Sequence, residues 1–138
     1  MAQVQKVIIF TNDGGGVSVC YPTGELSIQE VQEKDIPPEI ESYIVNVSTL
    51  PENHDFFDAW EQTKGVVTVN LDKAKNITKN RLRRERAPLL AAQDVAYQRA
   101  LETGASTTTI VAEKNRLRDI TKLADTCATL DELRALKV

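Results

Sequence analysis

The sequence predicts an α+β protein: a small N-terminal antiparallel β domain with one short helix, then a C-terminal helical hairpin and a short third helix. Two observations lead to this prediction. Short β-rich runs, separated by glycine and proline turns, fill the first half of the 138-residue chain. The second half is rich in alanine, leucine and charged residues that recur with helical periodicity.

The distribution of charge supports the same division. Residues 1–64 hold 3 Lys and Arg against 11 Asp and Glu, whereas residues 65–138 hold 14 against 9. We therefore predict an acidic α+β domain over 1–69 and a basic helical hairpin region over 70–138. Such a dipolar molecule can pair its halves internally or stack on copies and partners. The alternative is that each half only has a solvated charged surface.

Four strands are expected in the first domain. The β-rich run 6–10 and the alternating run 17–21 are joined by "TNDGGG", whose Asp-Gly and Gly-Gly steps suit a tight hairpin. The run "YIVNVSTL" predicts a third strand over 43–50, and "GVVTVNL" predicts a fourth over 65–71.

One short helix is expected between the second and third strands. Ser27 and Glu30 have the spacing of a capping box, so residues 27–35 are predicted to form about two turns. Pro37 and Pro38 follow, and each disfavours helix in the residue before it. The helix is therefore expected to end before them.

A long helix should open the second region. Asn70 is a favourable N-cap, and only Pro88 interrupts the helical pattern before Glu102. Pro88 should kink the helix or mark a restart, and Gly104 lies where a C-cap belongs. One side of this helix is expected to hold Leu71, Thr78, Leu82, Leu89, Gln93, Ala96, Tyr97 and Ala100.

Two further helices complete the prediction. The second covers roughly 107–124 and should pack antiparallel to the first, because the loop between them is short. The third begins at Thr129, which forms a capping box with Glu132.

The most unusual feature is a run of arginines. Segment 73–86 holds seven Lys and Arg against one Glu, enough charge to attract phosphates. The cations surround the helix instead of sharing one face, and within the arginine run 81–86 no aromatic or amide side chains interleave as base readers would. We interpret the run as a cationic collar at the helix kink, available to an acidic protein surface, which includes this chain's own first half. Nucleic acid is not the expected partner, although a nucleic-acid grip through 73–86 stays as an alternative.

An aromatic patch, "FFDAW" at 56–60, concentrates three of the aromatic residues. It suits the core of the small β domain, and it also suits a protein contact, since Trp and Phe are enriched at interfaces. On the second interpretation Phe57 and Trp60 anchor the contact, while Arg83, Arg84 and Arg86 steer the partner.

No catalytic residue, cofactor or metal site is predicted. "DGGG" at 13–16 lacks the Gly-Lys-Ser/Thr ending of a phosphate loop, so it is interpreted as a hairpin turn. His54 is the only histidine and no Ser or Cys nucleophile lies near it in sequence, so it is expected in a surface loop. The carboxylates lack metal-ligand spacing. We therefore expect a non-enzymatic protein.

Nothing near the N-terminus predicts export or a membrane. The apolar run 7–10 is too short for a signal core or a span, so no membrane partner is expected. Cys20 and Cys127 are isolated, which suggests synthesis in a reducing cytoplasm.

Several motifs together resemble small tail-region proteins of tailed bacteriophages and prophages, of the tail-fibre or tail-assembly type. They are "VIIFTNDGGGVSVCYP", "DAW", "LDKAK", "RLRRERAPLLAAQDVAYQRALETG", "IVAEKNRLRDIT" and "TLDELRAL". The recurrent positions include Asp94, Tyr97, Arg99, Leu117, Arg118 and Asp119. All of these could be structural: Leu117 would be core, while Arg118 and Asp119 could pair with the facing helix.

The resemblance implies a non-enzymatic structural component of the virion tail, synthesised in the host cytoplasm. Its expected partners are other tail or tail-fibre proteins and further copies of itself as a homo-oligomer. The alternative implied by the same resemblance is a soluble assembly chaperone that is absent from the mature virion.

Overall fold

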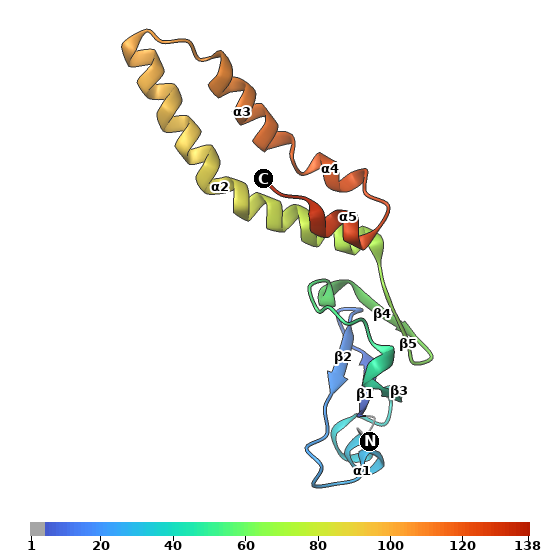
Figure 1. Cartoon of the computed structure of the whole chain (residues 1–138). Coiled ribbons are helices and arrows are strands. Elements are labelled where there is room, and N and C mark those ends of the chain that lie inside the picture. The colour runs from blue at the N-terminus through green and yellow to red at the C-terminus, as the bar shows by residue number, and fades with distance from the viewer. Residues whose placement is uncertain (1–4) are drawn as a thin grey trace. The chain divides into compact units, whose positions relative to one another are not determined.

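In the computed structural model, which describes residues 5–138, the chain divides into two compact units, Met1–Asn70 and Leu71–Val138 (Figure 1). The first unit combines antiparallel strands with a short helix, and the second consists of helices. The predicted α+β class is therefore confirmed.

The first unit is built around a three-stranded antiparallel sheet of order β2-β1-β3. Strands β4 and β5 form a separate antiparallel pair. The elements are β1 (Lys6–Thr11), β2 (Val17–Cys20), α1 (Ile28–Asp35), β3 (Ser42–Asn46), η1 (Val47–Thr49), η2 (Phe57–Ala59), β4 (Trp60–Thr63) and β5 (Val66–Val69).

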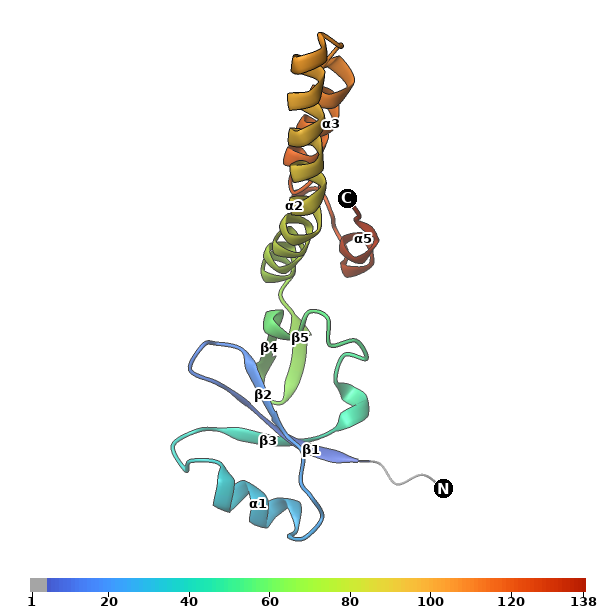
Figure 2. The same ribbon diagram turned by 90° about the vertical axis from the view of Figure 1, so that its left-hand side faces the viewer.

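The central strand β1 is buried on both faces, because different elements cover its two sides. Ile8 packs against Val31 and Ile36, which belong to α1 and the turn that follows it. On the opposite face, Val7 and Ile9 pack with Trp60 beneath the β4–β5 pair. Figure 2 shows α1 on one side of the sheet and β4–β5 on the other.

The predicted hairpin between β1 and β2 is confirmed, and its turn is held by a side chain. Asn12 Oδ1 accepts hydrogen bonds from the amides of Gly14 and Gly16, each at 3.1 Å. Gly15 has a φ of 82°, a conformation that L side chains rarely adopt. The predicted helix start is confirmed as well, since the Ser27 side chain accepts from the Glu30 amide at 3.2 Å.

Strand β4 was not predicted from the sequence, and the third strand is shorter than predicted. β4 and β5 meet at Lys64 and Gly65, whose φ angles of 50° and 86° form a tight two-residue hairpin. The third strand ends at Asn46 rather than at residue 50. The Thr49 hydroxyl donates to the Asn46 carbonyl at 2.7 Å, which favours the turn η1 over a continued strand.

The second unit consists of α2 (Leu71–Thr103), α3 (Thr108–Asp119), α4 (Lys122–Asp125) and α5 (Leu130–Ala135). Helix α2 continues through Pro88, and both views show it changing direction in its yellow-green middle part (Figures 1 and 2). The expected kink is therefore present and there is no restart. The C-cap prediction is confirmed, since Gly104 has a φ of 71° and the Ala105 amide donates to the Ala100 carbonyl at 2.8 Å.

Helix α3 runs back alongside α2 as the predicted antiparallel hairpin (Figure 1), but it ends earlier than expected. Residues 107–124 were predicted as one helix, whereas a turn at 120–121 separates α3 from α4. The core of this unit lies along the first half of α2, where Leu82, Leu117 and Leu133 have no exposed surface.

Candidate functional site

The aromatic patch belongs mainly to the core of the first unit. Trp60 is 0% exposed and packs with Val7 and Ile9, so it has no surface to offer a partner. The interpretation of Trp60 as a contact anchor is therefore wrong for this fold. Phe57 is half-buried, with its ring centroid 4.9 Å from that of Trp60, so of the two only Phe57 is accessible.

One polar atom in this core lacks a partner. Within residues 5–138, the indole Nε1 of Trp60 is the only buried side-chain nitrogen or oxygen without a hydrogen bond. The exposed His54 ring lies against Trp60 in an edge-on arrangement, with 5.2 Å between the two ring centroids. An unpaired buried donor costs stability, so the core of this unit is held by packing at Trp60 and not by its N–H.

The arginine run has a structural role that the sequence analysis did not predict. Arg81 Nη2 donates to the carbonyls of Leu133 and Leu136, at 3.2 and 2.8 Å, where α5 ends. The last carbonyls of a helix have no partner inside the helix and carry its partial negative charge. Arg81 therefore caps the C-terminal end of α5.

Arg86 caps the C-terminal end of α3. Its Nη1 donates to the carbonyls of Leu117 and Arg118, at 3.3 and 2.9 Å. In a continuous helix these carbonyls would accept from the amides of Thr121 and Lys122, four residues further on. The guanidinium thus takes the place of those amides, which accounts for the end of α3. Because its guanidinium is engaged with α3, Arg86 is less available for the steering role expected of it, and that role stays a prediction.

Two lysines from the same segment hold the end of α4. Lys79 Nζ lies 2.6 Å from a carboxylate oxygen of Asp125, and Lys75 Nζ donates to the Asp125 carbonyl at 3.3 Å. Lys75, Lys79, Arg81 and Arg86 of the first half of α2 therefore bind the C-terminal ends of three shorter helices.

Two arginines of the run remain at the surface. Within residues 5–138, the side chain of Arg83 is exposed and bonds only to Asn80 Oδ1 at 2.8 Å, one turn earlier on α2. The side chain of Arg84 is exposed and makes no hydrogen bond or ion pair with any residue of 5–138. These two side chains are the part of the proposed steering group that is accessible.

We expect replacement of Arg86 by methionine to lower the free energy of unfolding of the helical unit by about 1.5–3 kcal/mol, because two carbonyls lose a charged donor. Arg84→Met removes the same charge at an exposed position and should change it by less than about 0.5 kcal/mol. Urea denaturation followed by circular dichroism at 222 nm measures both. Equal effects of the two substitutions would contradict the capping role.

The hairpin is fastened by a lysine that lies between its two helices. Lys114 of α3 has only 15% of its side chain exposed and pairs with Asp94 of α2 at 2.7 Å. The same ammonium lies 5.1 Å from the centre of the Tyr97 ring, close enough for a cation–π interaction. Asp94 and Tyr97 are among the recurrent positions of the phage resemblance, and the structure brings them to one contact.

Three other recurrent positions have different structural environments, whereas Arg99 is exposed. Leu117 is fully buried, as expected. Asp119 pairs with Lys122 at 3.1 Å, one turn further on. The predicted pairing of Asp119 with the facing helix is therefore not observed. Arg118 contributes its carbonyl to the contact with Arg86.

Beyond its base, the hairpin has almost no core. From Arg83 to Arg99, no side chain of α2 is buried. Large apolar side chains are instead exposed along the hairpin: Leu89, Val95, Leu101 and Val111. Two helices alone leave their outer faces without a covering layer, so this part of the molecule is a candidate surface for protein contacts.

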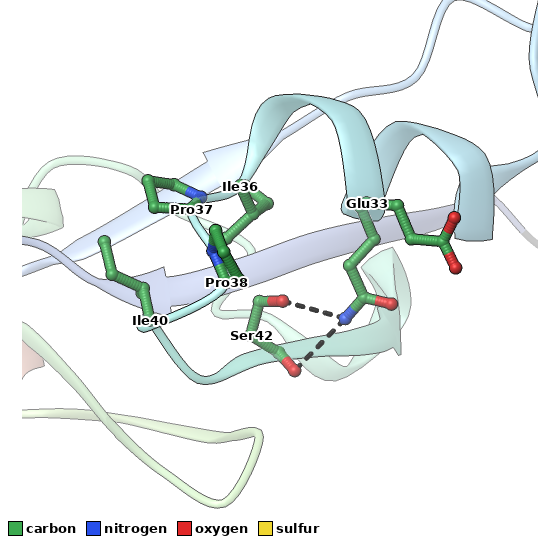
Figure 3. Close-up of a pocket in the computed structure, with 7 residues that line it drawn as sticks. Glu33, Ile36, Pro37, Pro38, Ile40 and Ser42 are labelled. Atoms are coloured by element: carbon green, nitrogen blue, oxygen red, sulfur yellow. Dashed lines mark hydrogen bonds between the residues drawn. The ribbon is translucent and has the colours of Figure 1, made fainter.

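The pocket in Figure 3 lies beside the end of α1 and offers little for chemistry. Apolar and proline side chains form most of its lining, and Glu33 is its one charged residue. The amide of Gln32 donates to the carbonyl and hydroxyl oxygens of Ser42, at 3.2 and 2.8 Å, so these polar groups already bond to one another. Over residues 5–138, no three His, Cys, Asp or Glu side chains lie close enough to hold a metal ion.

In the part of the chain that the structure describes, no helix is long and apolar enough to cross a bilayer. Cys127 is buried, and its burial raises the pKa of the thiol above its ordinary value. Its sulfur lies 3.4 Å from the Leu123 carbonyl, which suits a packed side chain.

Comparisons with protein-family models, with curated proteins and with solved structures find no match to this chain. The likeness to tail-region proteins of phages therefore stays a prediction, supported by the motifs quoted for it. Function has to be inferred from that likeness and from the geometry of the two units.

Proposed function

We propose that this chain is a non-enzymatic protein of a tailed bacteriophage, which docks tail or tail-fibre parts through protein–protein contacts. The observation that carries the proposal is the hairpin of α2 and α3, in which a long stretch of helix has no buried side chain yet bears exposed leucine and valine. Among residues 5–138, four of the eight exposed large apolar side chains lie on this hairpin. Exposed apolar surface of this kind is typical of regions that a partner covers.

The basic residues favour a protein partner over nucleic acid. Four of the seven cations in 73–86 bond to carbonyl or carboxylate oxygens of the shorter helices: Lys75, Lys79, Arg81 and Arg86. A nucleic-acid grip needs many cations free to meet phosphates. With these four engaged, the helical unit has much less charge available for that purpose than its sequence suggests.

On this proposal the protein is made in the host cytoplasm and becomes part of the virion tail. The same hairpin surface would also suit an assembly chaperone, which would cover apolar surfaces of tail subunits and then leave. The two roles share the surface and differ in whether the protein stays in the particle.

Deleting the gene from a phage that carries it tests the proposal. We expect heads that are filled with DNA, together with missing or defective tails or tail fibres in electron micrographs. Normal particles with unchanged infectivity would contradict a tail role.

Complementation then tests the surface. A variant with Leu101→Asp and Val111→Asp should fold, because both side chains are exposed, by 57% and 41%. It should fail to restore tails. Leu26→Asp, at an exposed apolar position in the first unit, is the matched control and should restore them. Restoration by both variants would exclude the hairpin as the docking surface.

A further inference from the structure

The outer face of α2, away from α3, carries a pattern that the docking proposal does not yet explain. Leu82 and Ala100 are both buried and lie eighteen residues apart, which is about five helical turns, so they mark one inner line along α2. Arg84 lies two residues after Leu82, and Glu102 lies two residues after Ala100. A step of two residues corresponds to about 200° around the helix. Arg84 and Glu102 therefore mark the two ends of a line on the outer face.

Between these ends the outer line alternates in steps of four and three residues, the spacing of a coiled-coil seam. Its members are Arg84, Pro88, Ala91, Val95, Gln98 and Glu102. At the centre of the line lie the small residue Ala91 and the apolar residue Val95, whose exposed fraction is 51%. A second helix can approach closely along such a line.

The line is also complementary to itself when reversed. Counting inward from both ends, Arg84 matches Glu102, Pro88 matches Gln98, and Ala91 matches Val95. An antiparallel copy with its twofold axis beside residue 93 therefore places opposite charges at both ends and apolar side chains in the middle. A twofold interface requires this kind of self-complementarity.

Two observations support a second copy as the occupant. Among residues 5–138, the side chains of Arg84 and Glu102 are exposed and make no hydrogen bond or ion pair, so both are available to an opposite charge. An open depression of about 450 Å³ lies on the same face, lined by Asp94, Val95, Gln98, Arg99 and Glu102. In the antiparallel register, Pro88 and Ala91 of the partner lie opposite this depression.

The bend at Pro88 is compatible with this arrangement if the Arg84 side chain extends toward the partner. In Figure 1, α3 and α5 lie on the inner side of the bend, so the first part of α2 turns toward them. Arg84 lies one turn before Pro88 and has to reach back toward the partner. The long, flexible side chain of arginine permits this.

We propose that two copies of this chain pair antiparallel through the outer face of α2, with Arg84 of each copy opposite Glu102 of the other. The inference rests on the proposed function only in taking the hairpin as a docking surface. Since one helix from each copy forms the contact, the interface is small and the dimer is expected to be weak, with a dissociation constant on the order of micromolar or above. Such a contact suits an assembly in which many copies are held near one another.

Sedimentation velocity of the full-length protein, over a roughly hundredfold range of concentration, tests the pairing. The wild type should pass from monomer to dimer. Arg84→Glu and Glu102→Arg, each alone, should weaken dimerisation by about tenfold, since each places like charges at both ends of the interface. The double variant should restore it, because opposite charges then face one another again.

Arg83→Glu is the matched control. It makes the same change of charge one residue away, about 100° around the helix, and should leave dimerisation unchanged. A wild type that stays monomeric throughout would overturn the inference. So would a dimer that neither single reversal weakens, or single variants that fold normally but whose effects the double variant does not reverse.

The test needs only purified protein, so it is separate from the tail role. A dimer whose gene deletion leaves particles normal would retain the pairing and refute the tail proposal. If the protein stays monomeric but is required for tails, the pairing is refuted and the tail proposal is retained.

Discussion

Replacing Trp60 with alanine is expected to lower the free energy of unfolding of the N-terminal unit by about 3–5 kcal/mol. Trp60 has no exposed surface and is the largest fully buried side chain among residues 5–138. Its removal takes apolar contacts from Val7 and Ile9 and leaves a cavity between the sheet and the β4–β5 pair. A small unit has only a few kcal/mol of net stability, so this loss is enough to unfold much of it.

Hydrogen exchange of the β1 amides measures the loss directly, because these amides lie in the central strand. Their exchange should become faster by roughly two to four orders of magnitude, up to the exchange rate of the unfolded unit. Trp60→Phe is the informative control. It keeps an aromatic ring and removes the indole N–H that has no partner, so the loss of volume is partly offset and stability should change by less than about 1.5 kcal/mol. Unchanged exchange in the alanine variant would contradict the core position of Trp60.

Replacing Leu82 with alanine should have the second largest effect, a loss of about 2–5 kcal/mol from the helical unit. Leu82 is fully buried on α2, in the part of the unit where Leu117 and Leu133 are also buried. Because the rest of the hairpin has so little core, few other contacts can compensate. The midpoint of urea denaturation, followed by circular dichroism at 222 nm, should fall accordingly.

Leu89→Ala provides the matched comparison, since it makes the same chemical change on the same helix. Leu89 is 42% exposed, and its replacement should cost less than about 1 kcal/mol. Equal losses at the two positions would show that the hairpin is packed along its whole length. The candidate docking surface would then not exist in the form described.

Local patterns predicted much of the fold. A β-rich run placed β1, alternating apolar residues placed β2, a capping box placed the start of α1, and Gly104 placed the end of α2. The strand β4 was missed because "WEQT" has no clear apolar alternation. The "KG" step between it and β5 was the available signal, as positive φ angles there form a tight turn.

The end of α3 could not be predicted locally, because it depends on Arg86, which is distant in sequence. A partial signal existed. Arg86 follows Leu82 by four residues, so it lies near the buried side of α2, whereas Arg84 lies opposite. Helical position therefore separates a structural arginine from a surface arginine, although it does not reveal which carbonyls the structural one contacts.

The aromatic patch shows a similar limit. Residues 56–60 were open to two interpretations, core or contact, and composition does not choose between them. Trp60 opens β4 and pairs with Val69, which places its side chain in the core, while Phe57 lies in the turn before it. Because β4 itself was missed, its consequence for Trp60 was missed as well.

The most direct test of the proposed tail role is quantitative mass spectrometry of gradient-purified phage particles, compared with the crude lysate. The proposal predicts that the protein is present in the particles at a fixed, stoichiometric copy number relative to other tail proteins. Presence in the lysate with absence from the particles would contradict a structural role in the virion and would favour the assembly chaperone.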